Sequence, residues 1–428
     1  MVNQTGNYCQ PACWRSSGRR YRIERIVAGM GEGPKQPAKR GLTWPVKLFL
    51  AFPLLVMLGG VVLTAAAFVP TRLAPLAREY PLIEDRSGRV PKKGCSLTEV
   101  ETQPGTCGAV TVTRVREEDV TFPSRLTEKG LARLQGTVTI PETAAGRRPA
   151  VVLIGGSGPT PRDSTSKGDL VHTLSAPFPL MKELAAHLGR LGFVVLRFDK
   201  RSCVRCYAGY RPDFKQFLFS DNVDDAKDAL AYLASRPEVD PRALVVAGHS
   251  EGGHFAPLVA EGQDGVRAVM LLAGTTEPFE VGLIAQLERL AQIRRRQLDF
   301  LASINIALAT RKYRGCFDRL EGPGYQPDEM CLGGGVTQRA LKEYRAMSLR
   351  VPELLRAAPY AIMAVQGSVD RNIDPLEIPR VARLCAGRDV ETHYVEGVDH
   401  PLTNAMKPAA LDDTVKARIA TFLASVGR

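Results

Sequence analysis

The sequence lacks several motifs that would assign it a ligand directly. It has neither a Gly-x-Gly-x-x-Gly loop nor a Walker lysine, which argues against a phosphate-binding loop for nucleotides. Cys-x-x-Cys occurs at 203–206 without a second such pair or a nearby histidine, so a structural zinc site is not favoured. No internal repeat, long low-complexity tract or nucleic-acid-binding motif is present. The chemistry of this chain must therefore come from individual side chains that the fold brings together.

What the sequence does have is a concentration of positive charge at its start. The 428 residues carry a formal net charge of +12, and residues 1–47 hold nine Lys/Arg against two Glu. Residues 48–69 follow without a single charge and are long enough to cross a bilayer as a helix. Basic residues before such a run keep the N-terminus cytoplasmic and place the residues after 70 on the other side. We predict a basic cytoplasmic segment at 1–47, a transmembrane or signal-anchor helix at 48–69, and a membrane rather than a nucleic acid as partner.

Cleavage is the alternative fate of the apolar segment. The small residues Ala65, Ala66 and Ala67 resemble a signal-peptidase site, and cleavage near Ala67 would give a secreted or periplasmic protein. The run is longer than the about 7–15 apolar residues of a cleaved signal, which favours the anchor. Met30 is an alternative start, and its use would leave the first two cysteines untranslated.

Seven cysteines lie beyond the apolar run, and their spacing predicts three local disulfides. The expected pairs are 95–107, 203–206 and 316–331, which leaves Cys385 unpaired. Disulfides persist outside the cytosol, so the pairing agrees with export. Zinc binding and a redox-active pair at 203–206 are the weaker alternatives.

Strand and helix patterns alternate along most of the remaining chain. Strands are expected at 131–140 (an edge strand), 150–154, 193–198, 243–247, 268–272, 360–365 and 390–395, and helices at 178–191, 222–234, 253–261, 376–386 and 411–426. This order predicts an α/β fold with a mostly parallel sheet and helices on both faces. The expected domains are a linker at 70–115, a core at 116–274 and 358–428, and a helical cap inserted at 275–357. Arg294–Arg296 in the cap are interpreted as a solvated helix face, or alternatively as a docking surface for an anionic substrate or lipid headgroup.

A candidate nucleophile sits between one of these strands and the next helix. Ser250 lies within Gly248-His249-Ser250-Glu251-Gly252, and the flanking glycines permit the tight turn of a nucleophile elbow. The helix that follows points its first backbone N–H groups at developing negative charge. We predict that Ser250 is the nucleophile of an acyl-transfer reaction.

A serine hydroxyl needs a base, and chain order selects it among six histidines. The expected order is nucleophile, acid, histidine, with the histidine after the last strand, and only His400 fits. Asp370 follows the preceding strand and is the expected acid, with Asp374 and Asp399 as competitors. The other histidines are assigned elsewhere: His187 on a core-packing helix, His249 and His254 in the elbow but turned from the serine oxygen, His393 in a strand, and His172 in a loop at the entrance.

The oxyanion hole requires two backbone N–H groups. Glu251, the residue after the nucleophile, supplies one. The turn after the first buried strand supplies the other, for which we expect the Ser157 N–H, with Gly156 allowing close approach.

Together these segments resemble bacterial α/β hydrolases related to serine aminopeptidases and prolyl-oligopeptidase-type esterases. The matching motifs are Gly155–Pro159 with Arg162-Asp163, Leu196–Arg201, Gly248–Gly253 with Ala256-Pro257, and Leu271–Gly274. The resemblance resumes around Asp370 and His400 at 360–428. It implies an α/β-hydrolase fold and hydrolysis of esters or related acyl bonds without a cofactor. Two segments depart from it: residues 202–206 replace a usual Gly-rich turn, and the cap has no recognisable counterpart.

The predicted function is therefore serine-dependent cleavage of a carboxylic ester in a small-molecule substrate. Aminopeptidase-like or amidase activity and acyl transfer in the cell envelope are the alternatives of the same class. A membrane-tethered binding protein that has the cleft but no turnover is the alternative of another class. The complete Ser, Asp and His set, in the expected order, favours the enzyme.

Overall fold

The computed structural model describes residues 83–85, 94–103, 106–110, 112, 114–142, 146–164, 178–332, 335–374 and 376–427. The basic segment 1–47, the predicted membrane helix 48–69, much of the predicted linker and His172 lie outside these residues. Of the helices that are described, none combines the length and the apolar character needed to cross a bilayer.

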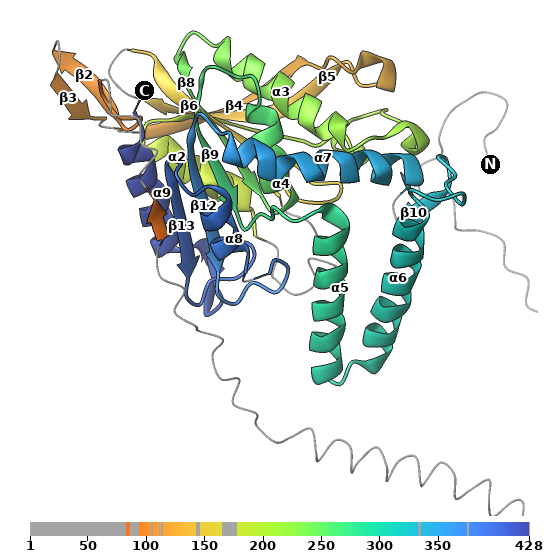
Figure 1. Ribbon diagram of the computed structural model, residues 1–428. Coiled ribbons are helices and arrows are strands. Elements are labelled where there is room, and N and C mark those ends of the chain that lie inside the picture. The colour runs from red at the N-terminus through yellow and green to blue at the C-terminus, as the bar shows by residue number, and fades with distance from the viewer. Residues whose placement is uncertain are drawn as a thin grey trace, which may run out of the picture. The chain divides into compact units, whose positions relative to one another are not determined.

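A nine-stranded sheet forms the centre of the described structure (Figure 1). Its strand order is β1-β13-β12-β9-β8-β6-β7-β5-β4. The strands from β13 to β7 run parallel. At one edge β1 pairs antiparallel with β13, and at the other β5 pairs antiparallel with β7 and β4 pairs antiparallel with β5. The bounds are Ile83–Asp85 for β1, Arg114–Pro123 for β4, Arg133–Glu142 for β5, Arg148–Ile154 for β6, Val194–Phe198 for β7, Val239–His249 for β8, Val266–Leu272 for β9, Ala361–Gly367 for β12 and Val390–Val395 for β13.

Helices cover both faces of the sheet because its central strands are apolar on both sides. In β6, Val151 and Leu153 pack in one core with α2 and α9, while Val152 and Ile154 pack in the other. The second core also holds the apolar sides of α3, α4 and α8. The bounds are Leu180–Arg190 for α2, Ser220–Ala234 for α3, Glu251–Ala260 for α4, Glu377–Leu384 for α8 and Asp413–Ser425 for α9. This is the predicted α/β-hydrolase arrangement.

The expected edge strand at 131–140 is not at the edge. It corresponds to β5, which pairs with β7 on one side and with β4 on the other. The sequence did not indicate the edge strand β4, because five of its ten residues are charged and only Phe122 is fully buried.

The predicted cap region is helical, but one of its helices belongs to the core. It contains α5 (Phe279–Arg296), α6 (Phe300–Asp318) and α7 (Gln338–Arg356). Leu341, Val351 and Leu355 of α7 are buried in the same core as Phe255 of α4. Only α5 and α6 extend away from the body as a hairpin (Figure 1).

Short elements complete the described chain. They are the paired strands β2 (Glu99–Gln103) with β3 (Thr106–Ala109), β10 (Met330–Leu332) with β11 (Val336–Thr337) and β14 (Thr403–Asn404) with β15 (Lys407–Leu411), and the 3-10 turns at Thr127–Lys129, Val204–Cys206 and Phe214–Gln216.

All three predicted disulfides are present, and Cys385 is free and buried. Cys95–Cys107 spans the β2–β3 hairpin, Cys203–Cys206 closes the turn after β7, and Cys316–Cys331 ties the end of α6 to β10. Each bond therefore fixes a segment that lies outside the central sheet.

Replacing Cys316 and Cys331 together with serine is expected to lower the free energy of unfolding by about 3 kcal/mol, because the bond closes a loop of 15 residues. Denaturant titration measures this change. Non-reducing peptide mapping should find all three linked pairs. Cys385 should be alkylated only after unfolding, since burial raises the pKa of its thiol to about 12. Seven free thiols, or stoichiometric zinc, would contradict this pairing.

Candidate active site

Ser250 occupies a strained turn between β8 and α4. Its φ is 55° and its ψ is −121°, a backbone conformation that residues with a side chain rarely adopt. A Cβ on Gly248 would lie 1.9 Å from the Gly252 oxygen, and one on Gly252 would lie 2.2 Å from the Ile154 oxygen. Both glycines are thus required for the turn to close. The Ser250 side chain makes no capping hydrogen bond to α4, so its hydroxyl is not used to start the helix.

The imidazole of His400 is held by a buried carboxylate. Its Nδ1 lies 2.9 Å from Asp370 Oδ2, and the Asp370 side chain is completely buried. The other carboxylate oxygen accepts hydrogen bonds from the backbone N–H groups of Asn372 and Ile373, at 2.7 and 3.1 Å. Because an ionised carboxylate only accepts, Nδ1 carries the proton and Nε2 is left as the basic nitrogen.

The two competing acids serve other partners. Asp374 pairs with Arg289 at 3.2 Å and accepts the Leu376 N–H. Asp399 accepts from the backbone and the hydroxyl of Thr403, which closes the turn after His400, and burial raises the pKa of its carboxyl. Among the three candidate acids, Asp370 is the one bonded to His400.

The loop after β6 passes directly over the nucleophile. A Cβ on Gly156 would lie 3.2 Å from Ser250 Cβ, which is the close approach expected there. The next residue, Ser157, is exposed, and no described residue accepts a hydrogen bond from its N–H. Glu251 is the first residue of α4, where a backbone N–H has no acceptor within the helix. The structure thus brings Gly156 against the serine, and the predicted donors Ser157 and Glu251 are the residues that follow these two in the chain.

A buried ion pair fixes this loop to the elbow, and the sequence did not indicate it. Lys200 Nζ donates to the Gly156 carbonyl at 2.9 Å and to Glu251 Oε2 at 3.0 Å. Both side chains are buried. Tyr344 of α7 lies against the same carboxylate, and burial together with the charge of Glu251 raises the pKa of its phenol well above the usual range. The resemblance had singled out the Leu196–Arg201 segment, but the sequence could not reveal a contact across 51 residues.

Replacing Lys200 with methionine is expected to affect mainly kcat, which should fall, and KM less. The Gly156 carbonyl loses its hydrogen bond to Lys200, while the nucleophile Ser250 remains. The variant should also lose about 3–5 kcal/mol of stability, since Glu251 is left buried without a counter-charge. Adding Glu251→Gln should restore much of the stability but not kcat. Steady-state kinetics and denaturant titration of both variants separate the two effects. Recovery of kcat in the double variant would contradict an anchoring role.

His249 contacts the predicted base, which the sequence also did not indicate. Its Nε2 lies 2.9 Å from the backbone oxygen of His400, and the centroids of the two imidazole rings are 4.7 Å apart. The elbow thereby holds the loop that carries His400. The remaining described histidines lie as expected: His187 on α2 bonds the Lys416 carbonyl, and His254 bonds the Thr275 carbonyl. His393 in β13 bonds Glu391.

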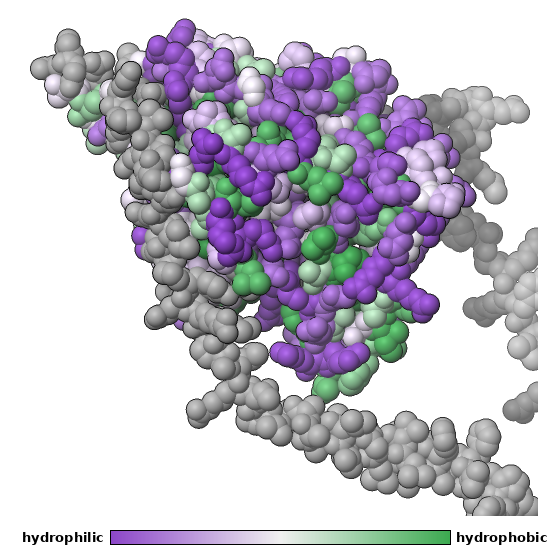
Figure 2. Space-filling view, viewed as in Figure 1, coloured by the Kyte–Doolittle hydropathy of each residue, from purple (hydrophilic) through white to green (hydrophobic). Residues whose placement is uncertain are grey.

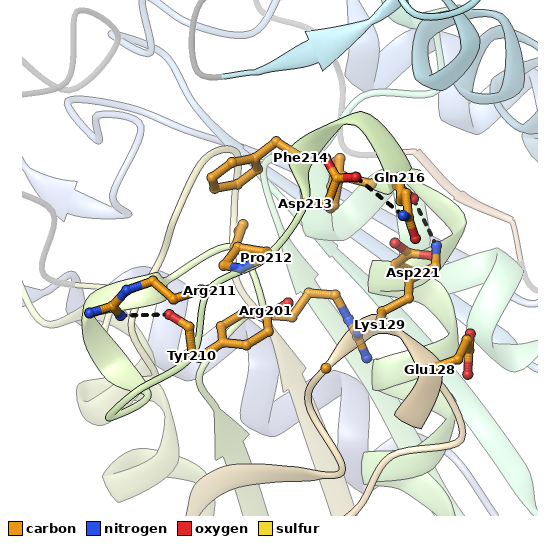
Figure 3. A pocket seen from close by; sticks show the side chains of 13 residues that line it. Glu128, Lys129, Arg201, Tyr210, Arg211, Pro212, Asp213, Phe214, Gln216 and Asp221 are labelled. Carbon is orange, nitrogen blue, oxygen red and sulfur yellow. Dashed lines mark hydrogen bonds and ion pairs between the residues drawn. The ribbon is translucent and has the colours of Figure 1, made fainter.

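A separate cavity of about 210 Å³ lies beside Arg201 (Figure 3). None of the predicted catalytic residues lines it. Several of its charged groups are bonded to protein partners: Lys129 to Asp221, and Arg201 to the buried Asp225. The Asp213 carboxylate accepts hydrogen bonds from the Lys215 backbone N–H and from the Gln216 side-chain amide. These bonds within the protein account for the charged side chains around the cavity without a ligand.

Comparison with known proteins finds a family model and a curated relative that match this chain. A family model described as serine aminopeptidase, S33, matches residues 170–406. Esterase EstD of Thermotoga maritima is 29% identical over 226 residues, which are 52% of this chain and 48% of that protein. The chain thus matches about half the length of that curated relative.

Solved structures are similar at lower identity. Est1E from Butyrivibrio proteoclasticus is 13% identical with a TM-score of 0.45, over 71% of this chain and 97% of that one. The esterase domain of a Rhodothermus marinus protein is 15% identical with a TM-score of 0.44, over 73% and 99%.

Proposed function

The chain belongs to the serine aminopeptidase S33 family of α/β hydrolases, and from that premise we propose that it is a serine hydrolase that cleaves a carboxylic ester through an acyl-enzyme on Ser250. One observation carries the proposal. The strained Ser250 at the end of β8 directly follows His249, whose ring contacts that of His400, and His400 Nδ1 is in turn bonded to the buried carboxylate of Asp370. This arrangement supports assigning Ser250 as the nucleophile, His400 as the base and Asp370 as the acid that orients it.

The proposed reaction has two steps. His400 Nε2 takes the proton of Ser250 Oγ as that oxygen attacks the ester carbonyl. The N–H groups of Ser157 and Glu251 donate to the resulting oxyanion. Collapse of the intermediate breaks the ester bond, and the leaving alcohol takes the proton from His400, which leaves the acyl group on Ser250. Water then attacks with the same base, and the carboxylic acid leaves as Ser250 regains its proton.

Ester cleavage is proposed over amide cleavage because the curated relative at 29% identity is named an esterase. A panel of p-nitrophenyl esters of increasing acyl length, set beside aminoacyl p-nitroanilides, tests the choice. We expect higher kcat/KM on the esters. Higher values on the anilides would favour an aminopeptidase or amidase, and ester consumption only with an added alcohol or amine acceptor would favour an acyltransferase. No turnover on any substrate would favour a binding protein.

We also propose that the hydrolase domain lies outside the cytoplasm, anchored by residues 48–69 or released by cleavage near Ala67. The basic residues before the apolar run and the three disulfides support this proposal. A reporter that is active only in the cytosol, fused after Arg428, should give no signal, whereas one that requires export should be active. The opposite pattern would contradict the predicted topology.

A further inference from the structure

The hairpin of α5 and α6 has very little core of its own. Leu287 and Leu290 of α5 pack with Ile306 of α6 in a small cluster separate from the two large cores. The rest of the hairpin extends from the body of the molecule (Figure 1). The end of the hairpin that points away from the body is therefore not covered by the central sheet or its helices (Figure 1).

Its end and the outer side of α6 are apolar. Five large side chains within eleven positions are exposed, to 43% for Leu298, 53% for Phe300, 78% for Leu301, 55% for Ile304 and 61% for Leu308. Leu301, Ile304 and Leu308 are spaced to lie in one stripe along α6. Figure 2 shows hydrophobic surface at the end of this hairpin, bordered by hydrophilic residues. Scattered exposed leucines are ordinary, but a contiguous group of this size marks an interaction surface.

The charged residues beside this stripe that have no ion-pair partner among the described residues are positive. Arg295 and Arg296 are exposed in the last turn of α5, and Arg311 and Lys312 follow the stripe on α6. None of these four forms an ion pair with a described residue. The hairpin's acidic groups nearest to them are already paired: Glu288 with Arg314 at 2.5 Å, and Asp299 with Arg294 at 3.6 Å. The apolar surface is therefore bordered by uncompensated positive charge.

From this combination we infer that the α5–α6 hairpin docks onto the surface of a bilayer that contains anionic lipids. The five apolar side chains enter the boundary between headgroups and acyl chains, and the long Arg and Lys side chains reach the lipid phosphates. A second copy of the chain is a poorer occupant, because a symmetric contact through this surface would bring the unpaired cations of both copies together. A bilayer offers both the apolar layer and the negative charge.

The hairpin is also joined to the predicted acid loop. Arg289 of α5 donates to the Asn372 carbonyl at 2.8 Å and pairs with Asp374. The Asn372 N–H in turn donates to Asp370. Docking of the hairpin would therefore hold the side of the molecule that carries the Asp370 loop toward the bilayer. The inference concerns lipid binding and does not depend on the proposed hydrolase activity.

Tryptophan fluorescence of the full-length chain tests the inference at the hairpin itself. The two native tryptophans, Trp14 and Trp44, are replaced with phenylalanine, and Phe300→Trp provides a single reporter. Leu349→Trp is the matched control, because Leu349 is 56% exposed on α7, outside the hairpin. Each chain is reconstituted into vesicles of phosphatidylcholine alone or mixed with phosphatidylglycerol. The Leu349→Trp control separates docking of the hairpin from attachment of the chain through any other segment.

We expect the Phe300→Trp emission to shift to the blue and to be quenched by brominated lipid in the mixed vesicles, with little change for Leu349→Trp. Replacing Arg295, Arg296, Arg311 and Lys312 with glutamine should return the reporter to its value in neutral vesicles. Equal quenching of both reporters, or of neither, would overturn the inference. A shift that depends on protein concentration and not on lipid composition would assign the surface to a second copy and would also overturn it.

Discussion

Replacing Ser250 or His400 with alanine is expected to lower kcat/KM on a chromogenic ester by about 10⁴–10⁶-fold. Without His400, nothing in the site takes the proton of the Ser250 hydroxyl, and a neutral hydroxyl is a poor nucleophile. Without Ser250, the base has no group to activate except water. Circular dichroism and thermal unfolding should show that both variants remain folded, because neither side chain belongs to the two large hydrophobic cores.

The double variant should lose little more activity than either single variant, since the two groups act as one unit. His187→Gln and Ser235→Ala are matched controls, in which the same residue types are changed at positions where the side chain only bonds a backbone carbonyl. Both controls should keep near-normal kcat/KM. Losses in the single variants that multiply in the double variant would contradict a shared proton transfer.

Asp370→Asn is the second substitution for which a large loss is expected, about 10⁴-fold in kcat. The carboxylate accepts a hydrogen bond from His400 Nδ1–H and two more from backbone N–H groups that hold it in place, and it is completely buried. An amide can turn its NH₂ group toward Nδ1 and so favour the tautomer that carries its proton on Nε2. The imidazole then cannot accept the serine proton. The residual rate should exceed that of His400→Ala if the asparagine variant still populates the productive tautomer.

Asp374→Asn and Asp399→Asn are the controls for this assignment, since each acid carries a different contact. Loss of the Asp374 charge weakens the pair with Arg289, and loss of the Asp399 charge weakens the turn at Thr403. Both should change kcat by less than about tenfold. A severe loss in either one, together with a near-normal Asp370→Asn, would reassign the acid.

The sequence predicted the parts of this architecture that have strong local signals. Continuous apolar runs identified the buried parallel strands β6, β8 and β9, because strands covered on both faces need apolar residues at every position. The glycines at 248 and 252 identified the elbow because steric exclusion leaves no other residue there. Chain order then selected His400 and Asp370, and the structure brings these two side chains into contact.

What the sequence did not predict depends on contacts between distant segments. The edge strand β4 exposes most of its side chains and carries little hydrophobic pattern. The packing of α7 in the core depends on Tyr344, whose ring stacks on those of Phe219 and Phe279 from other parts of the chain. The contacts of His249 with His400 and of Lys200 with Glu251 join residues 151 and 51 positions apart. No local pattern indicates such pairs.

The central claim is that Ser250 is an activated nucleophile, and a fluorophosphonate probe tests it most directly. The probe forms a covalent bond with an activated serine oxygen and requires no knowledge of the natural substrate. Peptide mapping of the labelled wild-type chain should place the modification on Ser250, with Ser250→Ala unlabelled and His400→Ala labelled far more slowly. A Ser250→Ala chain that keeps both labelling and ester turnover would contradict the account.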